Sequence, residues 1–204
     1  MKKLVTICIL LVLMSTGAAN AALTTLTFDE LTTQSVDGLS YSGITFGFKV
    51  SGISSTDAVY NDIGPGTLTY LQDPTLEGTA LGILTLDFAD PTDQLEFGVA
   101  LNTYDAQSLG YAVRLYDPSY QLIGTYFNDT SPLVLWSEGQ FTYSGALVSR
   151  AVVGFNDQAA SRFALDNLTF NAVNAVNAVP APGAVLLGSI GLGFVNWLRR
   201  RRTL

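Results

Sequence analysis

The chain has 204 residues, with no histidine and a single cysteine, Cys8. The absence of histidine excludes the commonest general base near neutral pH and the commonest neutral metal ligand. Six of the ten basic residues lie in the two end segments. All seventeen acidic residues lie between those segments with the other four basic ones, which gives the central part a net charge of −13. We expect so acidic a domain to bind no nucleic acid.

The first 21 residues have the pattern of a secretory signal peptide. Lys2 and Lys3 form a basic start, residues 4–14 form an apolar run of 11 residues that includes Cys8, and residues 19–21 read Ala-Asn-Ala. Signal peptidase reads small residues at such positions, so we expect cleavage after residue 21 and export through the inner membrane. The mature chain then has no cysteine, which excludes disulfides, a thiolate nucleophile and a zinc–thiolate site.

Residues 22–170 predict one all-β domain. Apolar residues alternate with polar or small ones in 44–50, 84–88, 95–101 and 111–115, and further strands are expected at 120–127, 140–155 and 163–170. Turn signals between these segments are Gly64-Pro65-Gly66, Asp73-Pro74, Asp90-Pro91, Asp117-Pro118 and Asn156-Asp157. Eight to ten short strands separated by such turns favour an antiparallel β-sandwich of the jelly-roll type.

Acidic residues stand at both ends of this domain. Residues 26–30 (LTFDE) and 163–170 (FALDNLTF) resemble the first and last strands of jelly-roll domains of exported bacterial proteins, an architecture shared by many carbohydrate-binding modules. The resemblance implies a structural Ca²⁺ that ties the first strand to the last, with Asp29, Glu30 and Asp166 as ligands; calcium prefers carboxylate and carbonyl oxygens. The apolar phase slips at Asp166, which predicts a β-bulge. The alternative is that these acids are exposed edge or turn residues.

The chain after this domain consists of four parts. Residues 171–179 repeat Asn-Ala-Val three times and predict a linker. Pro180, Ala181 and Pro182 follow, and the two prolines favour an extended backbone. Residues 184–198 are almost entirely apolar and predict a short transmembrane helix, whose length of about 22 Å falls below the hydrocarbon thickness of about 30 Å. The tail closes with a basic cluster that should stay cytoplasmic, formed by Arg199, Arg200, Arg201 and Arg202.

This order of parts resembles the PEP-CTERM sorting signal, which has a Pro-Glu-Pro motif, a short hydrophobic helix and a basic end. Residues 180–204 keep the order, but Ala181 stands where the family has Glu, which leaves the protease subtype open. The resemblance implies processing by an exosortase, a membrane cysteine protease, in a Gram-negative bacterium that makes exopolysaccharide. The protein would be anchored transiently in the inner membrane and then reach the cell surface or extracellular matrix. The alternative is an ordinary single-pass anchor that the protein keeps.

Exposed aromatic side chains on a β-sandwich can stack on sugar rings. Trp136, Tyr116 and Tyr120 are the ligand candidates, together with Tyr104 and Tyr143, and core or cross-strand packing is the alternative role of each. We therefore predict a non-catalytic binding or structural domain associated with exopolysaccharide. The second hypothesis is a secreted carbohydrate-active hydrolase, because a glycosidase needs two carboxylates and no histidine. The sequence singles out no such pair, and it lacks the residues of most hydrolase triads.

Overall fold

The structure is a computed structural model, and it describes residues 23–133 and 135–171. The strands of this part are β1 (Leu23–Leu26), β2 (Gln34–Ser35), β3 (Ser40–Tyr41), β4 (Ile44–Val50), β5 (Ile53–Ser54), β6 (Val59–Asp62), β7 (Thr75–Thr79), β8 (Gly82–Leu101), β9 (Gln107–Tyr116), β10 (Leu122–Pro132), β11 (Ser137–Phe155) and β12 (Arg162–Asn171). All their pairings are antiparallel, which confirms the predicted all-β class. Within the two described ranges, no helix is long and apolar enough to cross a membrane.

Strands β8 and β11 form a long two-stranded ribbon that runs through the whole fold. They pair along their length, and register shifts between Ser144 and Arg150 bend the ribbon in its middle. The first half of β8 also pairs with β4, whereas its second half pairs with β12. On the other side of the ribbon, the second half of β11 pairs with β9 and its start pairs with β10. The same two strands therefore contribute to two parts of the sheet.

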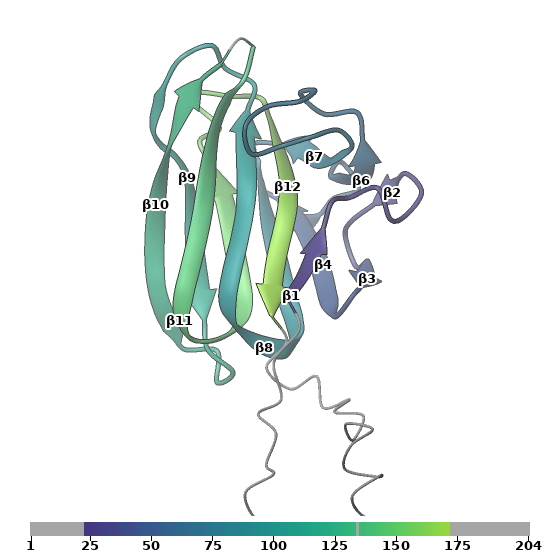
Figure 1. The fold of residues 1–204 in the computed structure, drawn as a ribbon, viewed down its shortest axis with the longest axis vertical. Helices are drawn as coiled ribbons and strands as arrows, with labels where there is room; N and C mark the ends of the chain where they lie inside the picture. Colours follow the sequence, from purple (N-terminus) through teal and green to yellow (C-terminus); the bar gives the residue numbers. More distant parts are fainter. Residues whose placement is uncertain (1–22, 134, 172–204) are drawn as a thin grey trace, which may run out of the picture. The chain divides into compact units, whose positions relative to one another are not determined.

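These two parts face each other as layers (Figure 1). The front layer contains β1, β12, the second half of β8 and the first half of β11, and the rear layer contains β4, the first half of β8, the second half of β11, β9 and most of β10. Aromatic rings from both layers meet between them. Phe163 of β12 stacks on Phe155 of β11, with ring centroids 3.8 Å apart, and lies 5.9 Å from Phe48 of β4. The core thus lies between the layers.

The alternation of apolar residues correctly predicted which side chains fill this core. The buried residues include Ile44, Phe46, Phe48, Leu84, Leu86, Phe88, Leu95, Phe97, Val99, Leu101, Tyr111, Val113 and Leu115. The predicted bulge in β12 is confirmed as well, because the register shifts between Asp166 and Thr169 and Asn167 has a φ of 54°. Phe163 before the bulge and Leu168 after it therefore both pack into the same core.

Two local predictions are wrong, and the number and length of strands also differ. Asp90-Pro91 lies inside β8 rather than at a turn, because it occupies the ribbon bend where the ladder to β11 skips from Asp87 to Thr92. A proline, which has no N–H to donate, is tolerated at such a gap. Asn171 is the buried last residue of β12 rather than the start of a linker, and its side-chain oxygen accepts a hydrogen bond from the Thr92 hydroxyl at 2.7 Å. Residues 23–133 and 135–171 contain twelve strands, and β8 and β11 have 20 and 19 residues.

The segment 63–74 covers part of the outer surface of the front layer. Its backbone is held by two buried carboxylates: Glu138 accepts hydrogen bonds from two of its N–H groups at 3.0–3.1 Å, and Asp166 Oδ2 accepts one from Gln72 at 2.8 Å. Leu71, which belongs to this segment, lies in a small hydrophobic cluster that is separate from the main core. The outward side chains of the rear layer remain half-buried or exposed.

Candidate functional site

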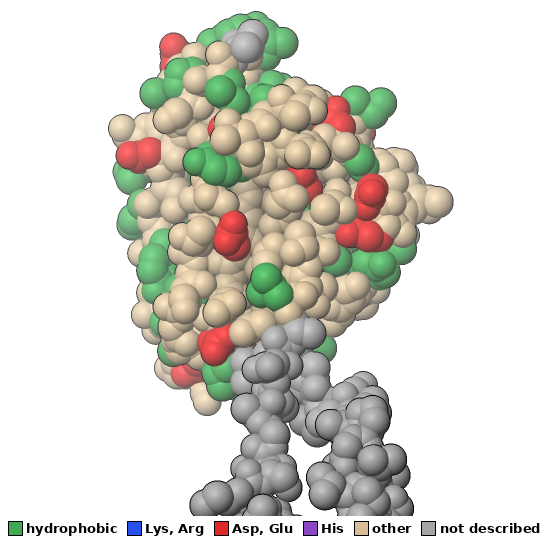
Figure 2. All heavy atoms as spheres, viewed as in Figure 1, with side chains coloured by type: hydrophobic (Ala, Val, Ile, Leu, Met, Phe, Trp, Pro, Cys, Tyr) green, Lys and Arg blue, Asp and Glu red, His purple; other side chains and the backbone are tan. Residues whose placement is uncertain are grey.

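The outward side chains of the rear layer form a surface that we call the basic face. Alternation along each strand sends them away from the core: Thr45, Gly47 and Lys49 of β4; Ile83, Thr85 and Asp87 of β8; Arg150, Val152 and Gly154 of β11; Ala112, Arg114 and Tyr116 of β9; Thr125 and Phe127 of β10. Three of the four basic residues in the described part of the chain lie here. The face of the molecule that is turned to the viewer in Figure 2 shows Asp and Glu side chains but no Lys or Arg side chains.

One row of the basic face forms a low floor between two apolar side chains. Cross-strand pairing places Phe127, Ala112, Gly154, Ile83 and Lys49 in line across five strands. Phe127 is 63% exposed and Ile83 is 41% exposed, whereas the two residues between them are small. A Cβ atom added at Gly154 would meet no atom within 4 Å. An extended ligand could therefore lie against the sheet between the two apolar side chains.

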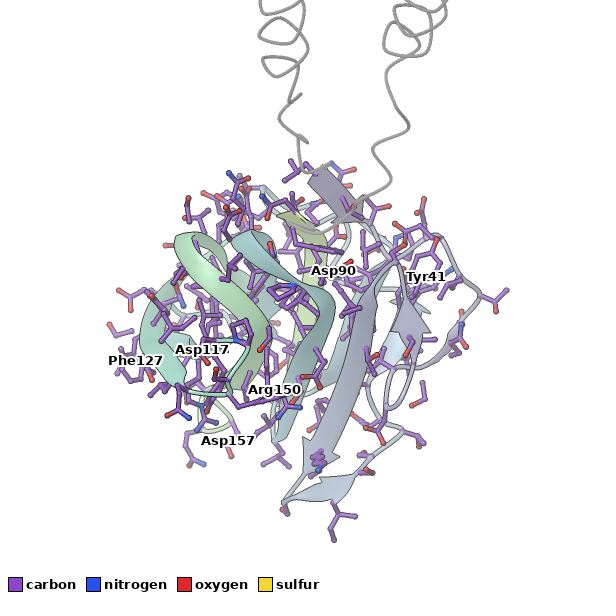
Figure 3. The ribbon with its side chains drawn as sticks, turned by 90° about the horizontal axis from the view of Figure 1, so that it is seen from below. Tyr41, Asp90, Asp117, Phe127, Arg150 and Asp157 are labelled. Atoms are coloured by element: carbon purple, nitrogen blue, oxygen red, sulfur yellow. The ribbon has the colours of Figure 1, made fainter. Side chains whose placement is uncertain are left out.

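A hollow of about 490 Å³ lies at the β10 end of this row. Phe127, Arg114 and Thr125 border it on β9 and β10, and Asn156 and Asp157 border it after β11. Figure 3 labels Phe127 and Asp157, two of the residues that line this hollow. An exposed aromatic ring next to a guanidinium, a hydroxyl, an amide and a carboxylate can both stack on a sugar ring and bond to its hydroxyl groups.

Arg150 is the centre of a second cluster on the basic face. Its Nε and Nη2 donate to the two carboxylate oxygens of Asp87 at 2.6 and 3.0 Å. Its guanidinium lies 4.9 Å from the ring centroid of Tyr120, and Tyr116 is its direct cross-strand neighbour on β9. The hydrogen bonds to Asp87 raise the pKa of Arg150 above its ordinary value, so its charge is fixed. Two of the predicted sugar-binding residues, Tyr116 and Tyr120, are thus brought together.

The turn from β9 to β10 positions Tyr120. Asp117 Oδ1 accepts hydrogen bonds from the backbone N–H groups of Ser119 and Gln121 at 2.8 and 2.9 Å, which closes the turn. Tyr120 has a φ of 60° and remains 59% exposed. The Asp117-Pro118 turn predicted from the sequence is therefore confirmed, and it presents an aromatic ring beside Arg150.

The third ligand candidate, Trp136, lies elsewhere. It is partly buried against the cluster of Leu71, Ala100 and Ala164 under the covering segment 63–74, so packing accounts for it. Of the two further candidates, Tyr143 is half-buried and its hydroxyl donates to the Ala146 carbonyl at 2.9 Å, whereas Tyr104 is 69% exposed.

Arg114, Arg150 and Phe127 were not among the residues that sequence reasoning proposed for the site. A usable signal existed for Arg114, because it stands between Val113 and Leu115, which alternation assigns to the core. A charged residue between two core positions must point out of the sheet. The sequence carried no signal that Phe127 and Arg150 belong to the same surface, because they come from strands that meet only through the intervening β9.

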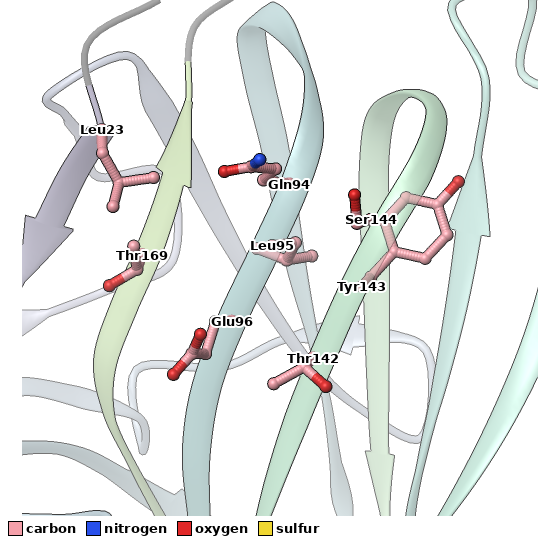
Figure 4. A pocket seen from close by; sticks show the side chains of 8 residues that line it. All are labelled: Leu23, Gln94, Leu95, Glu96, Thr142, Tyr143, Ser144 and Thr169. Atoms are coloured by element: carbon pink, nitrogen blue, oxygen red, sulfur yellow. The ribbon is translucent and has the colours of Figure 1, made fainter.

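A second hollow, of about 310 Å³, lies on the outer surface of the front layer (Figure 4). Its lining combines the uncharged polar side chains of Gln94, Thr142, Ser144 and Thr169 with the apolar ones of Leu23, Leu95 and Tyr143, and Glu96 is its one carboxylate. Glu96 Oε1 already accepts a hydrogen bond from the Gln140 amide at 2.6 Å. This hollow offers hydrogen-bonding groups but no cation, so the basic face is the better candidate for ligand recognition.

The residues proposed as calcium ligands have partners of their own. Asp29 Oδ1 accepts from the Thr27 hydroxyl at 2.7 Å, and Glu30 accepts from the Thr27 backbone at 2.7 Å and from the Tyr60 hydroxyl at 2.5 Å. Burial alone would raise the pKa of Glu30, but the hydrogen bonds from Tyr60 and Thr27 outweigh it and lower that pKa.

Asp166 differs from them because its Oδ1 is buried and accepts no hydrogen bond in the described part of the chain. Burial raises the pKa of Asp166 to about 6, and the negative charges of Glu30 and Asp29 add to this increase. An orphaned carboxylate oxygen near two further acids fits a cation in charge. Across the described ranges, however, no three Asp, Glu, His or Cys residues are grouped closely enough to hold a metal. The calcium site stays a prediction.

The predicted sorting motif, Pro180, Ala181 and Pro182 with the basic cluster Arg199 to Arg202, lies outside the described residues, as do the signal peptide and the apolar helix. The structure therefore leaves these predictions as they stand.

No protein-family model matches the chain, and no curated protein matches it. Among solved structures, the chain is similar to a family 29 carbohydrate-binding module from Piromyces equi, with 11% identity, a TM-score of 0.41, and 76% of this chain and 92% of that chain covered. The chain is also similar to the CBM22-1 xylan-binding domain from Paenibacillus barcinonensis Xyn10C, with 14% identity and a TM-score of 0.39; 78% of this chain and 100% of that chain are covered. For the K2 cleaved adhesin domain of Lys-gingipain, the identity is 15% and the TM-score is 0.38, and 73% of this chain and 99% of that chain are covered. Likenesses at this level assign no function to the chain.

Proposed function

We propose that the β domain binds a polysaccharide without cleaving it, and that its binding site is the basic face. The observation that carries this proposal is the row from Phe127 to Ile83, which offers an exposed ring and a flat, low floor beside a polar hollow. Polysaccharides are flat on their C–H faces and polar at their edges, so they need such a mixture of aromatic and hydrogen-bonding groups.

The proposal of a non-catalytic role rests on the carboxylates of the hollow. A glycosidase needs two carboxyl groups, about 5–5.5 Å or 6.5–9.5 Å apart, on either side of the scissile bond. Asp157 is the one acidic residue among those that line the hollow. We expect no hydrolysis of the bound polymer, which sugar-release assays over a polysaccharide panel can check.

Affinity electrophoresis through gels that contain single polysaccharides tests the binding proposal. The domain is expected to be retarded by at least one polymer, and Phe127→Ala is expected to weaken the retardation about tenfold, because stacking on aromatic rings is a main source of such affinity. Tyr104→Ala is the matched control, since Tyr104 is similarly exposed but does not belong to the basic face. Unretarded wild-type domain across a broad panel would refute the proposal.

We further propose that the protein is exported, processed by an exosortase-type protease at Pro180-Ala181-Pro182, and released to the cell surface or matrix. The order of parts in residues 180–204 supports this proposal. Mass spectrometry of the mature protein from cells should show a chain that starts at Ala22 and lacks the apolar segment 184–198. A mature chain that keeps Arg199 to Arg202 would support the permanent anchor instead.

A further inference from the structure

The positive charges of the domain are concentrated on the proposed binding surface. The described part of the chain has four basic residues, and Arg162 is bound by Glu77 and lies 3.8 Å from Asp57 in the ion-pair network beside β7. The other three, Lys49, Arg114 and Arg150, all project from the basic face. In a domain with a net charge of −13, such a distribution gathers the cationic groups at the site, where they lie beside Asp87 and Asp157.

The three cations of the basic face are not equivalent. Arg150 is neutralised by Asp87 through two hydrogen bonds. Arg114 and Lys49 are exposed and form no hydrogen bond or ion pair with any described residue. Arg114 borders the hollow next to Phe127, where the one carboxylate of the lining is Asp157. The guanidinium of Arg114 therefore offers a fork of N–H donors next to an exposed ring, and it has no acceptor within the described domain.

An unpaired guanidinium beside an aromatic ring fits a sugar that carries a carboxylate. Arginine binds carboxylates through two parallel N–H···O bonds, and these charge-assisted bonds are about twice as strong as neutral ones. The ring of Phe127 would contact the apolar face of the sugar while Arg114 binds its carboxylate. We propose that the ligand of the basic face is an acidic polysaccharide that contains uronic acids, and this inference rests on the proposed polysaccharide-binding function.

The positions of the unpaired cations restrict the charge density of the polymer. Arg114 is in register with Gly47 of β4, three strand spacings away, and Lys49 lies two residues further along β4. At about 4.8 Å per strand and about 3.4 Å per residue, the Cα atoms of Arg114 and Lys49 are about 16 Å apart. The surrounding acidic domain repels a polymer whose every sugar is charged. A polymer in which neutral sugars separate the uronic acids suits both conditions.

The test uses polymers with spaced uronic acids, namely gellan, xanthan and hyaluronan, each paired with its carboxyl-reduced form. At least one acidic polymer should bind the domain about tenfold more tightly than its reduced form, as one charge-assisted contact implies. Arg114→Gln should remove most of this difference while neutral binding through Phe127 persists. Arg114→Lys should retain part of the difference in affinity, because lysine keeps the positive charge but cannot form the two parallel N–H···O bonds of arginine.

Glu96→Gln is the matched control, because it raises the net charge of the domain by one on the outer surface of the front layer. If net charge governed binding, this variant would bind acidic polymers more tightly; contact with Arg114 predicts no change. Equal affinity for acidic and reduced polymers, or wild-type affinity in Arg114→Gln, overturns the inference. Phe127-dependent binding to neutral polymers alone would overturn the inference and leave the proposed function standing.

Discussion

Arg150 on β11 and Asp87 on β8 form a two-point ion pair across neighbouring strands, with N···O distances of 2.6 and 3.0 Å. About one third of each side chain is exposed. The pair lies on the outer surface of the rear layer, next to the ring of Tyr120. It therefore fixes the position of an aromatic side chain at the proposed binding site as well as joining two strands.

This arrangement predicts a modest coupling energy between the two residues. In a double-mutant cycle of Arg150→Gln and Asp87→Asn, urea unfolding should give a coupling of about 0.5–1 kcal/mol, because solvent screens a pair that is exposed to this degree. Arg150→Gln should also weaken polysaccharide binding, since Tyr120 loses the cation beneath its ring. Additive single-mutant effects would contradict the coupling.

The ion pair of Arg162 with Glu77 is expected to contribute more, because Glu77 is 7% exposed. Arg162→Met leaves the carboxylate buried without its cation, and we expect a loss of about 3 kcal/mol in the free energy of unfolding at pH 7. Burial already raises the pKa of Glu77 and Arg162 opposes this increase, so the variant raises that pKa further. The loss should thus be smaller at pH 4.5 than at pH 7. The double variant Arg162→Met/Glu77→Gln should recover most of it, and a double variant as unstable as the single one would contradict the explanation.

Asp166 predicts a pH dependence of stability. Its pKa is about 6 in the folded protein, against about 3.9 in an unfolded chain. The folded state therefore holds this proton more tightly, and the contribution of Asp166 to stability is largest below pH 4 and is lost as the pH rises through 6. The expected change is about 3 kcal/mol at 1.36 kcal/mol per pKa unit. Chemical unfolding in EDTA at several pH values should show it in the wild type, compared with a flatter profile in Asp166→Asn.

Calcium would reverse this dependence if Asp29, Glu30 and Asp166 bind it. A bound cation favours the ionised carboxylate and stabilises the folded state by mass action. We expect 5 mM CaCl₂, which is about five to fifty times the Kd of a weak extracellular calcium site, to raise the melting temperature relative to EDTA at pH 7. Asp166→Asn should remove that increase. A melting temperature unaffected by calcium in the wild type would show that the site does not exist.

Two glycines predict opposite results for the same substitution. A Cβ at Gly82 would lie 1.9 Å from Cζ of the buried Phe48, so Gly82→Ala should destabilise the domain by about 1–3 kcal/mol. A Cβ at Gly154 meets no atom within 4 Å, so Gly154→Ala should leave the stability equal or slightly higher. Gly154→Leu should fill the low floor beside Phe127 and reduce polysaccharide retention without unfolding. Thermal melts and affinity gels on the three variants check these expectations, and normal retention by Gly154→Leu would move the binding site elsewhere.

The sequence predicted the all-β class and much of the core because both depend on local alternation. The spacing of Leu84, Leu86 and Phe88 places them on one face of a strand, and that face is the buried one; the slip at Asp166 predicted its bulge. The ribbon bend was missed because proline signals a turn in most contexts. At Asp90-Pro91 the partner strand bends with β8, and this pairing of residues about 60 positions apart has no local signature.

The binding surface shows the same division between local and non-local information. Tyr116 and Tyr120 could be named from the sequence because exposed aromatics are common in sugar sites. Their grouping around Arg150 depends on the pairing of β9 with β11, which local patterns do not encode. Trp136 was the most prominent aromatic candidate, but the segment 63–74 folds over its neighbourhood and makes it a packing residue.

The pairing of β1 with β12 has a consequence for how the domain reaches its folded state. Leu23 pairs with Asn171 and Leu26 pairs with Leu168, so the first strand has its hydrogen-bonding partner at the opposite end of the domain sequence. A chain that emerges N-terminus first, from a ribosome or a translocation channel, cannot complete this ladder until almost the whole domain has passed. Contacts of such large sequence separation slow folding. The domain should therefore fold late and as one unit, and until then β1 remains an unpaired strand that is open to pairing with other chains.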